Sequence, residues 1–128
     1  MPQNIYHQYR NRQIVFPDDR YLSDFMDSIR SLERREDKLG VLMLEEELKT
    51  NDPDADERCG LLADRFEVFA IRIPGSTTHR LAVSIDFKSG QPAPPVMLHG
   101  VFRAQSACVQ ARRHAEQHRD LINPSWEP

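Results

Sequence analysis

Long apolar runs are absent from this 128-residue sequence, in which the longest, such as VLML at positions 41–44, have only four residues. A helix that crosses a bilayer needs roughly 18 or more consecutive apolar residues, so we expect no membrane partner. The first residues, MPQNIYHQYRNRQ, also lack the apolar segment of a secretory signal. These two absences predict a cytoplasmic protein.

Cysteine is scarce, since Cys59 and Cys108 are the only two in the chain. They form neither a CxxC pair nor a spacing typical of metal ligands. In a reducing compartment two distant cysteines are normally free thiols. The prediction is therefore two free thiols, and a disulfide between them is the less favoured alternative.

Glycine-rich and catalytic signatures are absent too. The glycines stand singly along the chain, which excludes the phosphate loops built on clustered glycines. No serine lies in a G-x-S-x-G turn, and neither cysteine has a local nucleophile signature. We therefore predict no catalytic residue and no cofactor.

The composition is that of a soluble globular protein, with 39% hydrophobic and 29% charged residues. The length suits one domain with its own core and is short for two. The predicted organisation is a single domain over residues 1–128. Within it, residues 1–12 are a possible flexible arm, 51–60 an acidic internal linker and 123–128 a tail.

Helical periodicity dominates the first third of the chain. Residues 16–37 predict one helix, because Pro17 and two aspartates suit its first turn and apolar residues recur every three or four positions. This core-facing stripe consists of Leu22, Phe25, Met26, Ile29 and Leu32. Gly40 is expected to end this helix or the turn after it. Residues 41–50 then favour a second helix, with a strand as the alternative.

The period changes to two after position 65. Residues 66–74 are apolar on both faces, residues 79–88 alternate between a buried and a wetter face, and 96–102 form a third strand. Residues 14–16 could add a short first strand, and 103–121 predict a last helix. The predicted fold is α+β: a three- to four-stranded antiparallel meander with an N-terminal helical pair and a C-terminal helix packed on the sheet, in the order (β)ααβββα.

Two families share parts of this element order. The order of a helix, three strands and a helix resembles that of double-stranded RNA-binding domains. The fuller order (β)ααβββα resembles that of the ribosome-dependent ribonuclease toxins of the RelE type, which implies an RNA-cleaving enzyme as a third functional reading. The last helix opens with FRAQSACV, where the first family has a lysine-rich turn, and the second family consists of basic proteins whereas this chain is acidic.

Charge is distributed unevenly along the chain. Residues 1–17 carry a net charge of +2, residues 18–64 carry −8 and residues 65–128 carry +3. This asymmetry is satisfied internally if the acidic half packs beside the basic one, and otherwise it steers a charged partner. Acidic charge exceeds what helix formation requires at Glu45, Glu46, Glu47, Asp52, Asp54, Asp56 and Glu57. These residues predict a small non-catalytic binding or regulatory module whose partner is a protein.

Aromatic and basic residues at the two ends of the chain support an alternative partner. Tyr6, Tyr9, Arg10 and Arg12 could stack on bases and pair with phosphates. The last helix adds Arg112, Arg113 and Arg119. A nucleic-acid-binding module is therefore the second reading, less favoured because ion pairs within the last helix explain its arginines equally well.

Two patterns that resemble metal sites do not meet the chemical requirements. His114 and His118 are one helical turn apart, but Glu116 stands at the third position of HAEQH, away from where zinc helices carry their glutamate. Asp52, Asp54 and Asp56 alternate as in a calcium loop, but the required glycine and final glutamate are missing. We predict that the histidines lie at the boundary between core and water, and we predict no metal site.

Overall fold

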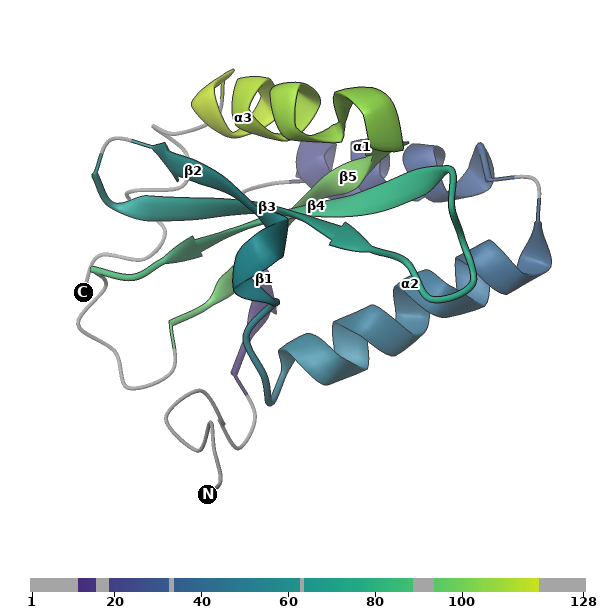
Figure 1. Cartoon of the computed structure of the whole chain (residues 1–128), viewed down its shortest axis with the longest axis horizontal. Coiled ribbons are helices and arrows are strands. Elements are labelled where there is room, and N and C mark those ends of the chain that lie inside the picture. The colour runs from purple at the N-terminus through teal and green to yellow at the C-terminus, as the bar shows by residue number, and fades with distance from the viewer. Residues whose placement is uncertain (1–11, 16–18, 33, 63, 89–93, 118–128) are drawn as a thin grey trace.

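A computed structural model of the chain describes residues 12–15, 19–32, 34–62, 64–88 and 94–117, without the side chains of 19–22 and 24. Figure 1 shows a sheet with helices on both of its faces. The elements in chain order are β1 (Ile14–Val15), α1 (Asp19–Arg30), α2 (Arg35–Leu48), the short helix η2 (Ala55–Glu57), β2 (Arg58–Leu62), β3 (Phe66–Arg72), β4 (His79–Asp86), β5 (Val96–Arg103), the short helix η3 (Ala104–Ser106) and α3 (Ala107–Gln117). The predicted α+β class is confirmed.

The sheet has five strands in the order β1-β5-β4-β3-β2. β2 through β5 run antiparallel to their neighbours, whereas β1 pairs with β5 in parallel, with Ile14 opposite Val96. The β1 pairing makes the sheet mixed, which differs from the purely antiparallel meander that the sequence predicts. It arises because two helices separate β1 from the rest of the sheet, so no hairpin dictates its direction.

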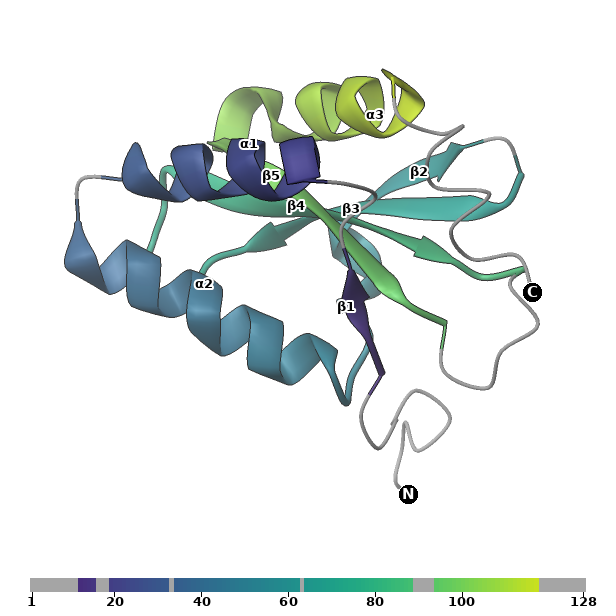
Figure 2. The same cartoon turned by 180° about the vertical axis from the view of Figure 1, so that it is seen from behind.

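Helices cover both faces of the sheet. In Figures 1 and 2, α3 lies above the sheet and α2 below it. The face toward α1 and α2 carries Phe69 and Ile71, and the face toward α3 carries Phe66 and Val68. Alternate residues of β3 therefore enter two separate core clusters, which explains why this strand is apolar on both sides.

The predicted helix over 16–37 is two helices, because α1 ends at Arg30 and α2 begins at Arg35. A single helix from Asp19 to Leu48 would be about 45 Å long, and an eight-residue strand is only about 27 Å long. Because one straight helix would be longer than the strands, the break after Arg30 allows α1 and α2 each to pack on the same sheet. Phe25 and Leu32 are buried as expected, but Met26 of the predicted stripe is exposed.

Gly40 lies inside α2 and is buried, so the prediction that it ends a helix is wrong. A Cβ atom at this position would stand 2.6 Å from the Ile73 side chain and 2.7 Å from the carbonyl oxygen of Pro74. Gly40 therefore permits a close approach of α2 to the end of β3. The helix predicted over 41–50 is confirmed as part of α2, which ends at Leu48.

The predicted linker over 51–60 contains structure. Residues Ala55–Glu57 form η2, and Arg58–Leu62 form β2, which adds an edge strand beside β3. β2 is short and carries an irregularity in its pairing between Arg58 and Gly60. Pairing with β3 stabilises it although its own sequence has little apolar periodicity.

Cys59 and Cys108 form a disulfide, which corrects the prediction of free thiols. Cys59 lies in β2 and Cys108 in the first turn of α3, so the bond ties the last helix to the edge strand. The two residues are 49 positions apart in sequence, and their proximity depends on the packing of α3 over the sheet. Sequence spacing alone does not reveal such a pair.

Candidate functional site

A hollow of about 220 Å³ lies where α2, the 51–57 segment and β3 meet. Its lining contains four of the predicted interaction residues, namely Glu47, Asp52, Asp54 and Glu57. Leu44, Leu48 and Ile71 contribute apolar surface, and Arg72 contributes a positive charge. The structure therefore brings together acidic residues from a helix and from the segment that follows it. We call this the acidic hollow.

Arg12 holds one wall of the acidic hollow in place. Its guanidinium donates hydrogen bonds to the carbonyl oxygens of Leu48 and Asn51 and to the Asp52 carboxylate, at 2.7, 2.9 and 2.6 Å. Its backbone N–H also donates to the carbonyl of Lys49. Arg12 is buried, and it satisfies the carbonyl of Leu48 at the end of α2 together with those of Lys49 and Asn51 just beyond it.

Arg72 forms ion pairs with two of the predicted acidic residues. Its backbone N–H donates to Glu57 Oε2 at 2.6 Å, and its guanidinium lies 3.2 Å from Asp56 and 3.5 Å from Glu57. The hydrogen bond to Asp56 is the largest cause that raises the pKa of Arg72 above its ordinary value. Glu57 is therefore buried and has a structural role, whereas Asp54 and Asp56 remain exposed.

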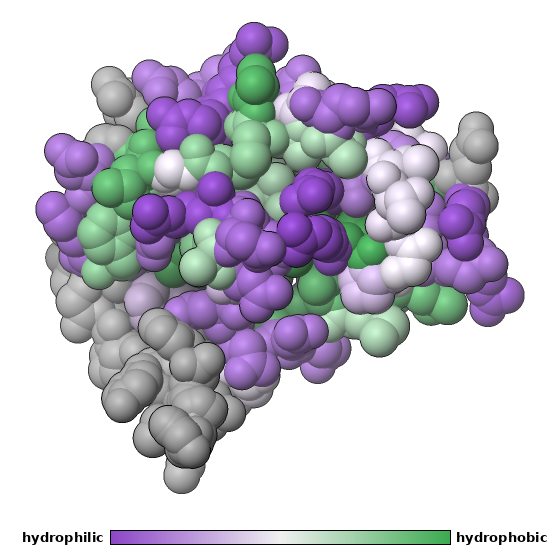
Figure 3. Space-filling view, in the orientation of Figure 1, coloured by the Kyte–Doolittle hydropathy of each residue, from purple (hydrophilic) through white to green (hydrophobic). Residues whose placement is uncertain are grey.

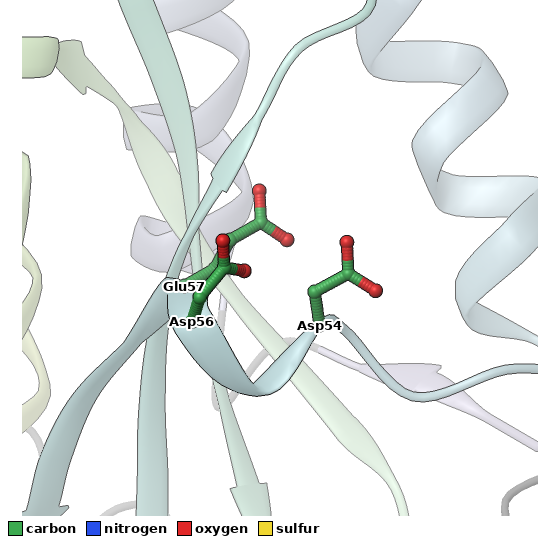
Figure 4. Close-up of side chains that lie close together, drawn as sticks. All are labelled: Asp54, Asp56 and Glu57. Carbon is green, nitrogen blue, oxygen red and sulfur yellow. The ribbon is translucent and has the colours of Figure 1, made fainter.

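Asp54, Asp56 and Glu57 are close enough to share one cation, since one oxygen from each lies within 4.8 Å of the others. Figure 4 shows the three side chains projecting to the same side of the turn that leads into β2. The Arg72 guanidinium already supplies positive charge to Asp56 and Glu57. The arrangement is explained by these ion pairs and gives no reason to assign a metal.

The three consecutive glutamates of α2 have different environments. Glu45 is half-buried, and desolvation by burial raises the pKa of its carboxyl, which Lys49 opposes. Glu46 is exposed and pairs with Lys49 at 2.8 Å. Glu47 is exposed and lines the acidic hollow. Glu46 and Glu47 are therefore the glutamates that a partner could contact.

The predicted nucleic-acid residues are only partly accessible to a polyanion. Arg12 is buried against α2, which removes it from such a surface. Arg112 is exposed and donates to the carbonyl of Leu61, and Arg113 is exposed on the same helix. The remaining candidates, Tyr6, Tyr9, Arg10 and Arg119, lie outside the described residues.

A chain of polar side chains runs beneath α3 and was not predicted. Ser84 Oγ lies 2.8 Å from His99 Nε2, and His99 Nδ1 lies 3.2 Å from His114 Nδ1. Ser84 and His99 are fully buried between the sheet and α3. His114 thus lies between core and water, as expected, whereas His118 is outside the described residues. The available sign that His99 is buried was its position in VMLHGVF, a strand whose other residues are apolar or glycine on both faces.

Asp37 is a second buried polar group that sequence reasoning missed. It lies in the first turn of α2, where the exposed amides of a helix favour negative charge. Among the described residues, its Oδ1 atom has no hydrogen-bond partner. This position at the helix N-terminus gives Asp37 a structural role.

Comparison of the chain with models of protein families, with curated proteins and with solved structures finds no match. Within the part of the chain that the structure describes, no helix is long and apolar enough to span a bilayer. Function is therefore inferred from the residues of the site rather than from a relative.

Proposed function

We propose that the protein is a non-catalytic binding or regulatory module of the cytoplasm whose partner is a protein with basic side chains. Residues 35–57 carry nine acidic and three basic residues, a net charge of −6. A field of one sign steers a partner of the opposite sign and increases its association rate. The Cys59–Cys108 disulfide is the observation that weighs against a cytoplasmic location, because disulfides are rare in that compartment.

The observation that carries the proposal is the acidic hollow. Its volume of about 220 Å³ is below the roughly 300 to 1,000 Å³ typical of small-molecule sites. It suits a single long side chain, because Leu44, Leu48 and Ile71 can contact an aliphatic stem while Glu47 and Asp54 face a charged head. A lysine or arginine of a partner protein has this combination of stem and charge.

Affinity capture with charge-reversed variants tests the proposal. The variant with Glu47→Lys and Asp54→Lys removes exposed acids of the hollow, and the control with Asp27→Lys and Glu116→Lys changes net charge equally on α1 and α3. We expect one partner protein to be captured from nuclease-treated lysate by the natural chain and by the control, and to be lost with the hollow variant. Equal capture by both variants would refute a role for the hollow.

Nucleic-acid binding remains a second proposal because two observations favour it. Arg112 and Arg113 are exposed on α3. The structure also contains β1, the short first strand of the element order that resembles the order of RelE-type ribonuclease toxins. A polyanion would bind on the α3 side, since the acidic hollow lies with α2 on the opposite side of the sheet. Salt-dependent binding to RNA and DNA, together with an assay for RNA cleavage, tests this alternative.

A further inference from the structure

The disulfide between Cys59 and Cys108 lies at the surface of the protein. Cys108 is exposed in the first turn of α3, and Cys59 is half-buried in β2. β2 is an edge strand of the sheet, so the bond joins two peripheral elements. Exposed disulfides are the ones that thiols reach and reduce, whereas structural disulfides resist the glutathione pool. The bond therefore has the access that reversible reduction requires.

The apolar contact of α3 with the sheet comes from small side chains. Its buried residues are Ala107, Ala111 and Ala115, whereas α2 buries a valine and two leucines. Because the free energy of burial rises with apolar area, three alanine methyl groups hold a helix less firmly than those larger side chains do. Figure 3 shows mostly hydrophilic atoms along the top of the molecule, where α3 lies in Figure 1. The apolar side of α3 is therefore narrow.

Polar contacts also join α3 to the sheet. Arg112 is exposed and donates to the carbonyl of Leu61 in β2 at 3.0 Å, and His114 lies 3.2 Å from His99 in β5. Hydrogen bonds of this kind replace bonds to water, so the net contribution of each to stability is small. The disulfide closes a loop with a sequence separation of 49, which makes it a strong constraint on the position of α3.

α3 covers an apolar part of the sheet. Phe66, Val68 and Met97 are fully buried in the core cluster that Ala111 and Ala115 complete. These side chains meet water if α3 moves away. The other core cluster lies on the opposite face of the sheet and includes no residue of α3. The rest of the fold thus keeps a core of its own when α3 leaves.

We infer that the Cys59–Cys108 disulfide is a reversible redox switch, which holds α3 on the sheet when oxidised and releases it when a thiol of the glutathione class reduces it. The inference goes beyond the proposed function and does not rest on the acidic hollow, which lies on the other side of the sheet. It also reconciles the disulfide with the proposed cytoplasmic location, because disulfides of that compartment are usually transient and redox-sensing.

The reduction balances with two molecules of a monothiol. The thiolate of the first attacks the Cys108 sulfur, the bond between the two cysteine sulfurs breaks, and Cys59 leaves as a thiolate that takes up a proton. The second attacks the reductant sulfur of the mixed disulfide, so that Cys108 leaves and the two reductant molecules become one disulfide. The same steps in reverse restore the bond. Arg112 stands one helical turn after Cys108, where its positive charge favours the Cys108 thiolate.

Hydrogen exchange of the intact chain in glutathione buffers tests the inference, with NMR to resolve single amides. Alkylation followed by mass spectrometry counts the free thiols. We expect reduced glutathione to convert the folded chain to the dithiol form without denaturant, and oxidised glutathione to restore the disulfide. On reduction, the protection of α3 amides should fall at least tenfold more than that of β4 and α2 amides. Fluorescence of a dye that binds apolar surface should rise in the same samples.

The variant with Cys59→Ser and Cys108→Ser is the control, and its α3 amides should be equally unprotected in both glutathione buffers. A disulfide that reduced glutathione cannot open in the folded chain would overturn the inference. A reduced chain whose α3 stays as protected as in the oxidised chain would also overturn it, because the bond would then not control the helix. An equal loss of protection throughout the reduced chain would overturn it too, since the bond would then stabilise the whole fold rather than α3.

Discussion

His99 on β5 and His114 on α3 face each other through their Nδ1 atoms, 3.2 Å apart, and their rings are nearly perpendicular. One of these nitrogens must carry the hydrogen and the other must accept it. The tautomer of His99 in turn decides whether Ser84 donates to its Nε2 or accepts from it. The three side chains therefore act as one buried polar unit between the sheet and the last helix.

Ser84→Ala should destabilise the protein by about 1 to 3 kcal/mol, because it leaves the buried His99 Nε2 without this hydrogen bond. Urea denaturation measures the loss. The same substitution in a His99→Phe background should cost less, since no imidazole nitrogen remains to be left unpaired. Equal costs in both backgrounds would show that Ser84 and His99 are not energetically coupled.

Arg12→Met should destabilise the protein by about 2 to 4 kcal/mol. The substitution keeps an apolar stem but leaves the carbonyls of Leu48 and Asn51 and the Asp52 carboxylate without these hydrogen bonds. Arg113→Met, at an exposed position of α3, is the control and should change stability by less than about 0.5 kcal/mol. Similar denaturation midpoints for the two variants would contradict the role assigned to Arg12.

Reduction of the Cys59–Cys108 disulfide should lower stability by about 4 kcal/mol, because the bond closes a loop with a sequence separation of 49. Thermal melts with and without dithiothreitol measure the difference. A variant with Cys59→Ser and Cys108→Ser should melt at one temperature in both conditions. If the natural chain is equally insensitive to reductant, the bond is not formed in solution.

Glu45→Gln should raise the melting temperature at pH 7. Burial raises the pKa of Glu45 in the folded state above the unfolded pKa of about 4.3. The protonated Glu45 therefore contributes fully to the free energy of unfolding below about pH 4.3, and this contribution is lost as pH rises through the folded-state pKa. The advantage of glutamine should thus vanish below about pH 4. Glu116→Gln, at an exposed position of α3, should give little change at either pH. A Glu45→Gln variant less stable at pH 7 would mean that attraction to Lys49 outweighs desolvation.

Titration with mixed single-stranded and duplex oligonucleotides at physiological salt should show only weak binding, with a Kd on the order of 10⁻⁴ M. The reason is the net charge of −8 on residues 18–64, which repels a polyanion. Submicromolar binding that Arg112→Glu with Arg113→Glu abolishes, in a folded variant, would instead establish the nucleic-acid alternative. Cleavage of RNA in the same samples would establish the ribonuclease reading.

Periodicity in the sequence was sufficient to predict most elements. The two-residue period over 79–88 and the helical spacing of Phe25, Ile29 and Leu32 depend on neighbouring positions only. β4 and α1 lie within the predicted ranges for that reason. The prediction that one face of β4 is wetter was wrong, because Ala82, Ser84 and Asp86 on that face are all buried. Excess acidic charge is visible without knowledge of the fold, so Glu47, Asp52, Asp54 and Glu57 of the hollow could be named as interaction candidates, and their contact with a partner stays a prediction.

Contacts between distant positions could not be predicted in this way. α2 carries a glycine at position 40 because Ile73 and Pro74 leave no room there for a side chain, and β2 is a strand because β3 is beside it. The pairs Cys59–Cys108 and His99–His114 exist because α3 crosses the sheet. Composition and the local periodicity of apolar residues are properties of the sequence alone, and they determined the α+β class and the acidic surface. The hydrogen-bond or disulfide partner of each buried polar or sulfur atom was decided only by the tertiary structure, because packing brings distant segments together.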